Sequence, residues 1–202
     1  MAAPPDIDLS LNEVESLALK AARGSGLAWG VAEDTGRAAV WMARHAGGWA
    51  GALLRLLETP PPRGEHPLLL AGFLADTLGA GPRTVERAVE PGWLLPGLLL
   101  AHPTRPLSIR IGATEIRFGT QTGPTATCPA DSLLVLPPST VAVLFPDLEL
   151  PALPHVLAPR LRRGCVALDD WRRLDALAQR TYVPASDASR RRGAGGARLD
   201  DD

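Results

Sequence analysis

The sequence contains little cysteine and histidine, and both shortages argue against metal or disulfide chemistry. Its two cysteines, Cys128 and Cys165, lie far apart and form no C-x-x-C pair, so we expect neither a disulfide scaffold nor a zinc finger. The four histidines are scattered without the short spacing of metal ligands: His45, His66, His102 and His155. We therefore expect no metal site and no cofactor.

Lysine is nearly absent, because 20 of the 21 basic residues are arginine and Lys20 is the single exception. An enzyme that forms a Schiff base would have only Lys20 available. The chain also lacks a nucleophile–base set and a complete nucleotide-binding motif. These absences favour a non-enzyme but do not exclude catalysis.

Long apolar runs are also missing. Leu68–Leu78 and Trp93–Ala101 fall short of the roughly 20 residues that span a bilayer, and Asp76 interrupts the first run. The opening segment, MAAPPDIDLS, has neither the basic nor the apolar region of a secretory signal. We expect a soluble cytoplasmic protein without a membrane partner.

Charge is nearly balanced, with a net charge of −1, but it is unevenly distributed. Residues 158–199 contain ten arginines and four aspartates, and three aspartates end the chain. Arg190–Arg192 could contact RNA phosphates, although the nearby Asp200–Asp202 opposes that role. A solvated tail is the preferred interpretation, and nucleic-acid binding is the least favoured function.

The best-defined local pattern is a capped helical hairpin. Ser10 and Glu13 form an S-x-x-E capping box, which predicts a helix beginning after Ser10. Gly24 is expected to close that helix in the left-handed conformation. After the hinge, a second helix is expected from about Leu27 to His45, and so short a connection requires the two helices to pack together.

Further helices and strands follow from the spacing of apolar residues. Helices are expected over Trp49–Leu57, Leu68–Leu78 and Thr84–Val89, whereas Pro96 and Gly97 argue against a regular helix over Trp93–Ala101. Leu107–Ile111 and Thr114–Phe118 alternate around Gly112 as a β-hairpin would. The remaining strand candidates are Leu133–Leu136, Val141–Phe145 and Cys165–Leu168.

Together these elements predict an α+β fold. It comprises a helical N-terminal half with a capped hairpin, a small and mainly antiparallel sheet, a C-terminal helix and an extended tail. Asp169 or Asp170 is expected to cap the last helix. We expect one domain over residues 1–185, with a helical part at about 9–101, a β-rich part at about 105–168 and a closing helix at about 170–181, followed by a tail at 186–202.

The hinge is the first candidate site. The segment Arg23-Gly24-Ser25-Gly26 opens into a helix, whose free N–H groups could bind an anion with Lys20 and Arg23 as countercharges. The alternative is a tight turn in which the glycines serve geometry alone, and that alternative is favoured.

Asp34 and the tryptophans are less specific. Helical spacing places Asp34 between Val31 and Ala38 on the apolar face, where a lone carboxylate is unfavourable. It either pairs with an arginine or lies exposed at the hairpin edge, or it is a working carboxylate with a raised pKa. Trp29 and the other tryptophans could stack on bases or sugars, but core packing and interface anchoring are the commoner roles.

Several motifs resemble a bacterial domain-of-unknown-function family, number 3726. They are S-L-N-E-x-E at Ser10–Glu15, A-A-R-G-x-G at Ala21–Gly26, W-G-x-A-E-x-x-G at Trp29–Gly36, and R-T-Y-x-P-A-x-x-x-S-R at Arg180–Arg190, followed by a Gly-rich, acid-tipped end at Gly193–Asp202. Asp34-Thr35 and Gly195-Gly196-Ala197 depart from the family pattern. The resemblance implies that the tail belongs to the domain, and it implies no activity.

If hinge and tail are both family features, we expect the tail to fold back on the helical hairpin. The ligand-binding residues would then be Arg23, Gly24, Gly26, Trp29, Glu33, Asp34, Arg180, Tyr182, Ser186, Ser189 and Arg190. Arginines with neighbouring hydroxyls bind carboxylates and phosphates well, so the partner would be a small anionic molecule or an acidic protein.

Three functions remain open on these observations. The preferred one is a non-catalytic accessory or binding module with this anion site. The alternative is an enzyme acting on a small carboxylated or phosphorylated metabolite, with Glu33, Asp34 or Tyr182 transferring a proton. The third is nucleic-acid binding through the arginine-rich C-terminal segment.

Overall fold

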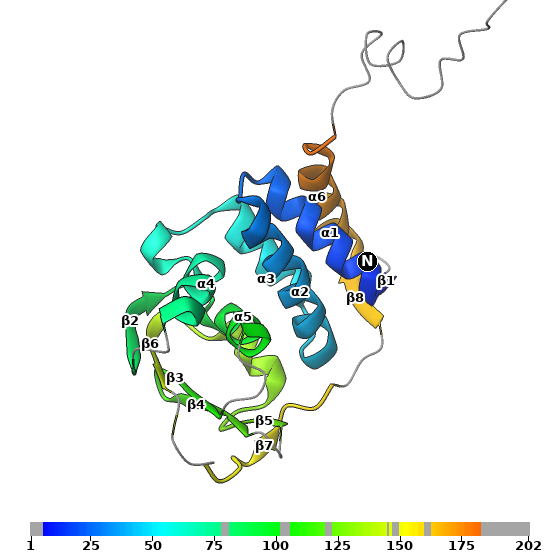
Figure 1. Ribbon diagram of the computed structural model, residues 1–202. Coiled ribbons are helices and arrows are strands. Elements are labelled where there is room, and N and C mark those ends of the chain that lie inside the picture. The colour runs from blue at the N-terminus through cyan, green and yellow to red at the C-terminus, as the bar shows by residue number, and fades with distance from the viewer. Residues whose placement is uncertain are drawn as a thin grey trace, which may run out of the picture.

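A computed structural model describes residues 6–77, 81–101, 106–119, 123–144, 146, 150–159 and 163–182. These residues form an α+β fold, as the sequence predicts (Figure 1). The predicted tail at 186–202 lies outside the described residues. No helix among those described is both long enough and apolar enough to cross a membrane.

The described part of the chain opens with a short strand that runs directly into the first helix. Strand β1 (Asp6–Ser10) is followed by α1 (Leu11–Gly24), and Ser10 is the N-cap. The Ser10 backbone N–H donates to Glu13 Oε2 at 2.7 Å, while the Glu13 N–H donates to Ser10 Oγ at 3.3 Å. The Ser10 hydroxyl also donates to Glu13 Oε2 at 2.7 Å, and this bond, together with the one from the Ser10 backbone N–H, holds the pKa of Glu13 below its ordinary value. The predicted capping box is confirmed.

The hinge after α1 differs from the prediction in detail. The left-handed residue is Gly26, with φ of 100°, and Gly24 is still helical with Ser25 as its C-cap. Gly24 is required for another reason, because a Cβ atom there would lie 1.8 Å from the carbonyl oxygen of Leu177. The second helix begins at Trp29, two residues later than expected.

Four helices and a two-stranded sheet build the first core. Helices α2 (Trp29–His45), α3 (Trp49–Glu58) and α6 (Leu168–Gln179) pack with α1, while β1 pairs antiparallel with β8 (Arg163–Ala167). The buried residues of this group include Val14, Ala18, Met42, Trp49, Leu53, Leu54 and Leu174. The pairing of β1 with β8 joins the two ends of the described chain.

Helix α6 is not capped as predicted. Its N-cap is Ala167, which makes no side-chain hydrogen bond, and the helix begins at Leu168. Asp169 and Asp170 lie inside the first turn, where carboxylates favour the positive end of the helix dipole. Leu174, Leu177 and Ala178 form its buried face.

A six-stranded sheet builds the second core, and each strand pairs antiparallel with its neighbour. Its strands, in spatial order, are β2 (Arg83–Ala88), β6 (Ser139–Leu144), β3 (Leu107–Ile111), β4 (Thr114–Gly119), β5 (Gly123–Ala126) and β7 (His155–Val156). Helices α4 (Pro67–Thr77) and α5 (Leu94–Ala101) cover one face and lie between the sheet and the first helical group (Figure 1).

Helix α5 forms where Pro96 and Gly97 argued against a regular helix. Pro96 stands in the first turn, where a backbone N–H has no helical partner and the proline ring is tolerated. Gly97 permits close packing on α4, because a Cβ atom there would lie 2.6 Å from Ala71 Cβ. Both residues therefore suit this helix.

The hairpin of β3 and β4 is confirmed, with Gly112 in the turn at φ of 56°. Two other predictions are wrong. The segment Thr84–Val89 falls mostly in β2, because pairing with β6 outweighs its helical spacing. Leu133–Leu136 falls mostly in the 3-10 helix η4 (Ala130–Val135). There Leu133 packs in the sheet core and Leu134 in the helical core, so two consecutive side chains are both buried.

Candidate functional site

The predicted hinge residues line a pocket of about 540 Å³ between α1, the start of α2 and the end of α6. We call it the hinge pocket. Three basic residues, Lys20, Arg23 and Arg180, and two aromatic residues, Trp29 and Tyr182, line it together with the hinge glycines. None of its described lining residues carries a carboxylate. Figure 1 shows the α1–α2 hinge and the end of α6 at the same end of the helical group.

Two of the cations are held against aromatic rings. The Arg23 guanidinium lies 5.4 Å from the centre of the Trp29 ring, and its Nη1 donates to the Leu27 carbonyl at 2.6 Å. Lys20 Nζ lies 5.5 Å from the centre of the Tyr182 ring and donates to its hydroxyl at 3.1 Å. These contacts position both charges without neutralising them.

Arg180 is the third cation of the hinge pocket. It is the C-cap of α6, and within the described part of the chain its guanidinium forms no salt bridge. The positive end of α2 is close by, since Ala28 is an N-cap without a side-chain hydrogen bond and the first turn has no acidic residue. The three basic side chains of the hinge pocket and the N-terminal end of α2 therefore all contribute positive charge.

Glu33 and Asp34 are not among the lining residues. Glu33 accepts a hydrogen bond from Trp29 Nε1 at 2.7 Å, so it orients the indole from one turn further along α2. Asp34 is exposed and forms an ion pair with Arg37 at 2.5 Å. The prediction that Asp34 lies on the apolar face is therefore wrong, and exposure with arginine pairing is what the structure has.

The buried face of α2 explains this placement. It is turned toward Gly36, where a Cβ atom would lie 3.0 Å from the Glu15 carbonyl oxygen of α1. Small residues at this crossing let α1 and α2 approach closely. The side of α2 that packs on α1 is therefore the side of Gly36, and Asp34 lies on another side. The buried residues there are Ala32, Thr35, Gly36, Ala38 and Ala39.

Three predicted residues, Ser186, Ser189 and Arg190, lie outside the described residues. The described chain ends at Tyr182, which lines the hinge pocket. The contact between Lys20 and Tyr182 was not predicted, although Lys20 stands one helical turn before Arg23 and so shares its face.

A comparison with known protein families gives a match, which covers the α1–α2 hinge. Residues 9–58 match the model of a family described as a protein of unknown function, DUF3726. The resemblance is thus confirmed for this segment. The DUF3726 match contains the capping box, the hinge and helices α1 to α3, and it does not reach the motif that begins at Arg180. Searches of curated proteins and of solved structures gave no match.

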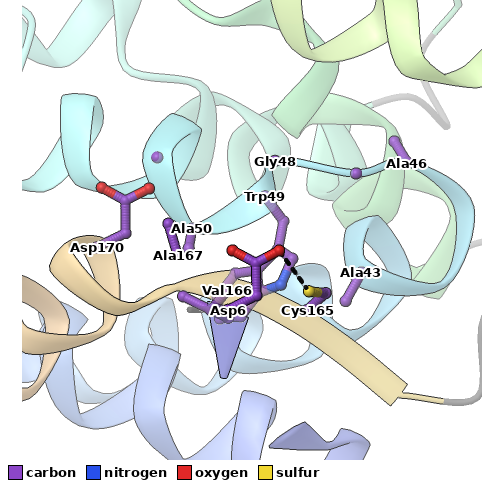
Figure 2. A pocket seen from close by; sticks show the side chains of 12 residues that line it. Asp6, Ala43, Ala46, Gly48, Trp49, Ala50, Cys165, Val166, Ala167 and Asp170 are labelled. Carbon is purple, nitrogen blue, oxygen red and sulfur yellow. Dashed lines mark hydrogen bonds between the residues drawn. The ribbon is translucent and has the colours of Figure 1, made fainter. Parts of the chain in front are cut away.

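A smaller cavity of about 260 Å³ lies at the start of α3 (Figure 2). Part of its lining also belongs to the segment that matches DUF3726. Cys165 Sγ donates to Asp6 Oδ2 at 3.4 Å. Burial and the neighbouring Asp6 raise the pKa of the Cys165 thiol, which keeps it protonated and a poor nucleophile.

The carboxylates of this cavity have a structural role. Asp170 Oδ2 would lie 3.1 Å from a Cβ atom on Gly51, so its negative charge is close to the first turn of α3. Among the described residues, no group of three or more histidine, cysteine or acidic side chains is arranged to hold a metal ion. The charged residues in the described lining of this cavity are acidic, whereas those of the hinge pocket are basic.

Proposed function

We propose that this protein is a non-catalytic binding module whose hinge pocket binds a small molecule carrying a carboxylate or a phosphate. The observation that carries the proposal is the convergence of Lys20, Arg23 and Arg180 on one pocket whose described lining has no acidic residue. Converging cations without a counterion favour an anionic ligand.

The aromatic residues suggest how such a ligand would be held. Trp29 is 60% exposed, which is unusual for a tryptophan that serves only packing. With Tyr182 it offers an apolar wall beside the cations. A planar anion could stack on this wall while its charged group meets the arginines.

Binding is favoured over catalysis because the two candidate carboxylates are engaged elsewhere, and the third candidate, Tyr182, lines the pocket with its hydroxyl already accepting a hydrogen bond from Lys20. Glu33 accepts from Trp29, and Asp34 pairs with Arg37. Neither carboxylate lines the hinge pocket, so neither is placed to reach a ligand there.

The test is a thermal-shift screen of the full chain with phosphate, pyrophosphate, citrate and AMP. At least one anion should raise the melting temperature, and Arg23→Ala or Arg180→Ala should abolish the shift. Arg37→Ala is the matched control, because it removes an exposed arginine of α2 that is not part of the lining. The proposal fails if no anion stabilises the protein or if all three variants respond alike.

A further inference from the structure

A larger cavity lies on the other side of the hinge, and its lining is mainly apolar. Its volume is about 880 Å³, within the range of small-molecule sites. We call it the linker cavity, because the proline linker between α3 and α4 forms one wall. Its apolar lining is Leu27, Pro60, Pro61, Leu69, Leu70 and Phe73.

A buried histidine without partners lines this cavity. His66 is only 3% exposed, and apart from an interaction with its own backbone neither ring nitrogen has a hydrogen-bond partner within the described residues. Buried polar side-chain atoms are nearly always hydrogen-bonded, so two unpaired nitrogens on one ring call for an explanation. A ligand that supplies the missing partner provides one.

His45 shows how this fold accommodates a histidine that has only a structural role. It is also buried, but its Nδ1 lies 2.7 Å from the Trp41 carbonyl oxygen and its ring stacks on Trp41 with centroids 4.1 Å apart. The contrast with His66 shows that burial of an imidazole in this chain does not by itself leave both nitrogens unpaired.

Arg63 and Phe73 complete the chemistry of the linker cavity. Arg63, in the 3-10 helix η1 (Arg63–Glu65), lines the cavity and forms no salt bridge with any residue the structure describes. Phe73 is 60% exposed, so a large apolar ring faces the opening. Burial lowers the pKa of His66, so near neutral pH the ring has one N–H donor.

We propose that the linker cavity binds a small molecule with an apolar body and a carboxylate head. The carboxylate accepts a hydrogen bond from the His66 ring and meets the charge of Arg63, while the apolar body covers Leu69, Leu70 and Phe73. This proposal does not depend on the hinge pocket, with which the linker cavity shares only Gly26 among the lining residues.

The lining favours this ligand over a multiply charged anion. Among its described lining residues, Arg63 is the only basic one besides the neutral His66, whereas the hinge pocket has three cations. A phosphate or citrate would leave most of the apolar wall uncovered and exposed to water. One carboxylate on an aliphatic or aromatic body matches both parts of the lining.

The test is isothermal titration of the full chain with octanoate. Octan-1-ol, octyltrimethylammonium and acetate are the comparison ligands, which remove the charge, reverse it, or remove the apolar body. Octanoate should bind, and each comparison ligand should bind about tenfold or more weakly, as expected when one charged hydrogen bond or the apolar contact is lost. Equal binding of octanol and octanoate would overturn the carboxylate assignment, and no binding of octanoate would overturn the site.

Variants locate the ligand. His66→Leu and Arg63→Ala should each weaken octanoate binding by about tenfold or more, and Arg63→Lys should restore part of it. His45→Leu and Arg37→Ala should leave the affinity unchanged, since neither residue lines the cavity. If Arg23→Ala removes binding while His66→Leu does not, octanoate occupies the hinge pocket and the proposal is wrong.

A direct readout guards against a variant that fails to fold. The ring nitrogens of His66 in the wild-type chain should change their NMR chemical shifts on addition of octanoate, while those of His45 should not. Unchanged His66 nitrogens at saturating octanoate would contradict the proposal, whatever the variants show.

Discussion

Gly24 and Leu177 approach each other so closely that a Cβ atom on Gly24 would lie 1.8 Å from the Leu177 carbonyl oxygen. This contact sets the end of α1 against the last turns of α6. It brings Arg180 and Tyr182 to the pocket that Arg23 and the hinge also line. The hinge pocket therefore depends on a backbone approach that only glycine allows.

Replacing Gly24 by alanine should lower stability and disturb the hinge pocket. The added methyl group meets a backbone carbonyl, so α1 and α6 must separate, at a cost of about 1–3 kcal/mol. Urea denaturation measures this loss. Gly30→Ala is the matched control, because Gly30 is exposed in α2 and a Cβ atom added there would meet no described atom of another part of the chain within 4 Å. That control should be neutral or slightly stabilising. Equal stability of the two variants would show that the contact is unimportant.

His66→Leu should stabilise the ligand-free protein or leave its stability unchanged. A buried polar group without partners costs roughly 1–3 kcal/mol, and leucine removes that cost at similar volume. His45→Leu should destabilise the protein, because the hydrogen bond between the imidazole and the Trp41 carbonyl is lost together with the stacked ring. Chemical denaturation of both variants distinguishes them. Loss of stability in both would indicate that His66 is a structural residue.

Stability should fall as the pH drops below the ordinary histidine range. Burial lowers the pKa values of His45 and His66 in the folded chain, and the charge of Arg44 adds to the effect at His45. Below the unfolded value of about 6.5, the unfolded chain binds protons that the folded chain does not, so the free energy of unfolding decreases. The loss continues until the lowered folded pKa values are reached, and stability is unaffected by these groups above about pH 6.5.

Melting temperatures at roughly pH 7.5 and pH 5.5 measure this dependence, because the unfolded histidine pKa lies between these two pH values. The double variant His45→Leu/His66→Leu should show a flatter profile over the same interval. A wild-type chain that becomes more stable on acidification through this interval would contradict the assignment of neutral, buried imidazoles.

Ser10→Ala should cost about 1 kcal/mol of stability, because it removes the hydroxyl that accepts from the Glu13 backbone N–H and donates to the Glu13 carboxylate. Ser16→Ala is the control, because Ser16 is an exposed residue in the middle of the same helix. Thermal or urea denaturation provides the comparison. If the two serine variants lose equal stability, the capping box contributes nothing beyond helix propensity.

Local patterns were enough to predict the capping box, the helical hairpin and the β3–β4 hairpin. Each depends on residues a few positions apart, whose hydrogen bonds form within one element or one turn. The pairing of β1 with β8 could not be predicted, because the register of Asp6 opposite Ala167 joins segments far apart in the sequence, and the polar–apolar alternation of DIDLS does not specify which strand it pairs with. The strand over Arg83–Ala88 was missed for the same kind of reason, since its partner β6 lies far along the sequence.

The candidate site was predictable in part. Arg23, Gly26 and Trp29 stand in one short segment with visible chemistry, and Arg180 and Tyr182, which follow helix α6, line the same pocket. The linker cavity could not be foreseen, because His66 is a lone histidine whose unpaired state arises only from the packing of α4 against the linker and the hinge.

In the proposed function, Arg23 and Arg180 bind the anion in the hinge pocket, and these arginines come from opposite ends of the described chain. Isothermal titration of pyrophosphate into the full chain and into Arg180→Ala tests it most directly, with Arg37→Ala as the control. Loss of one charged hydrogen bond corresponds to roughly 1.5–3 kcal/mol, so Arg180→Ala should bind about 10- to 100-fold more weakly while Arg37→Ala binds like wild type. Equal affinity in all three proteins, or no binding in any of them, would contradict the account.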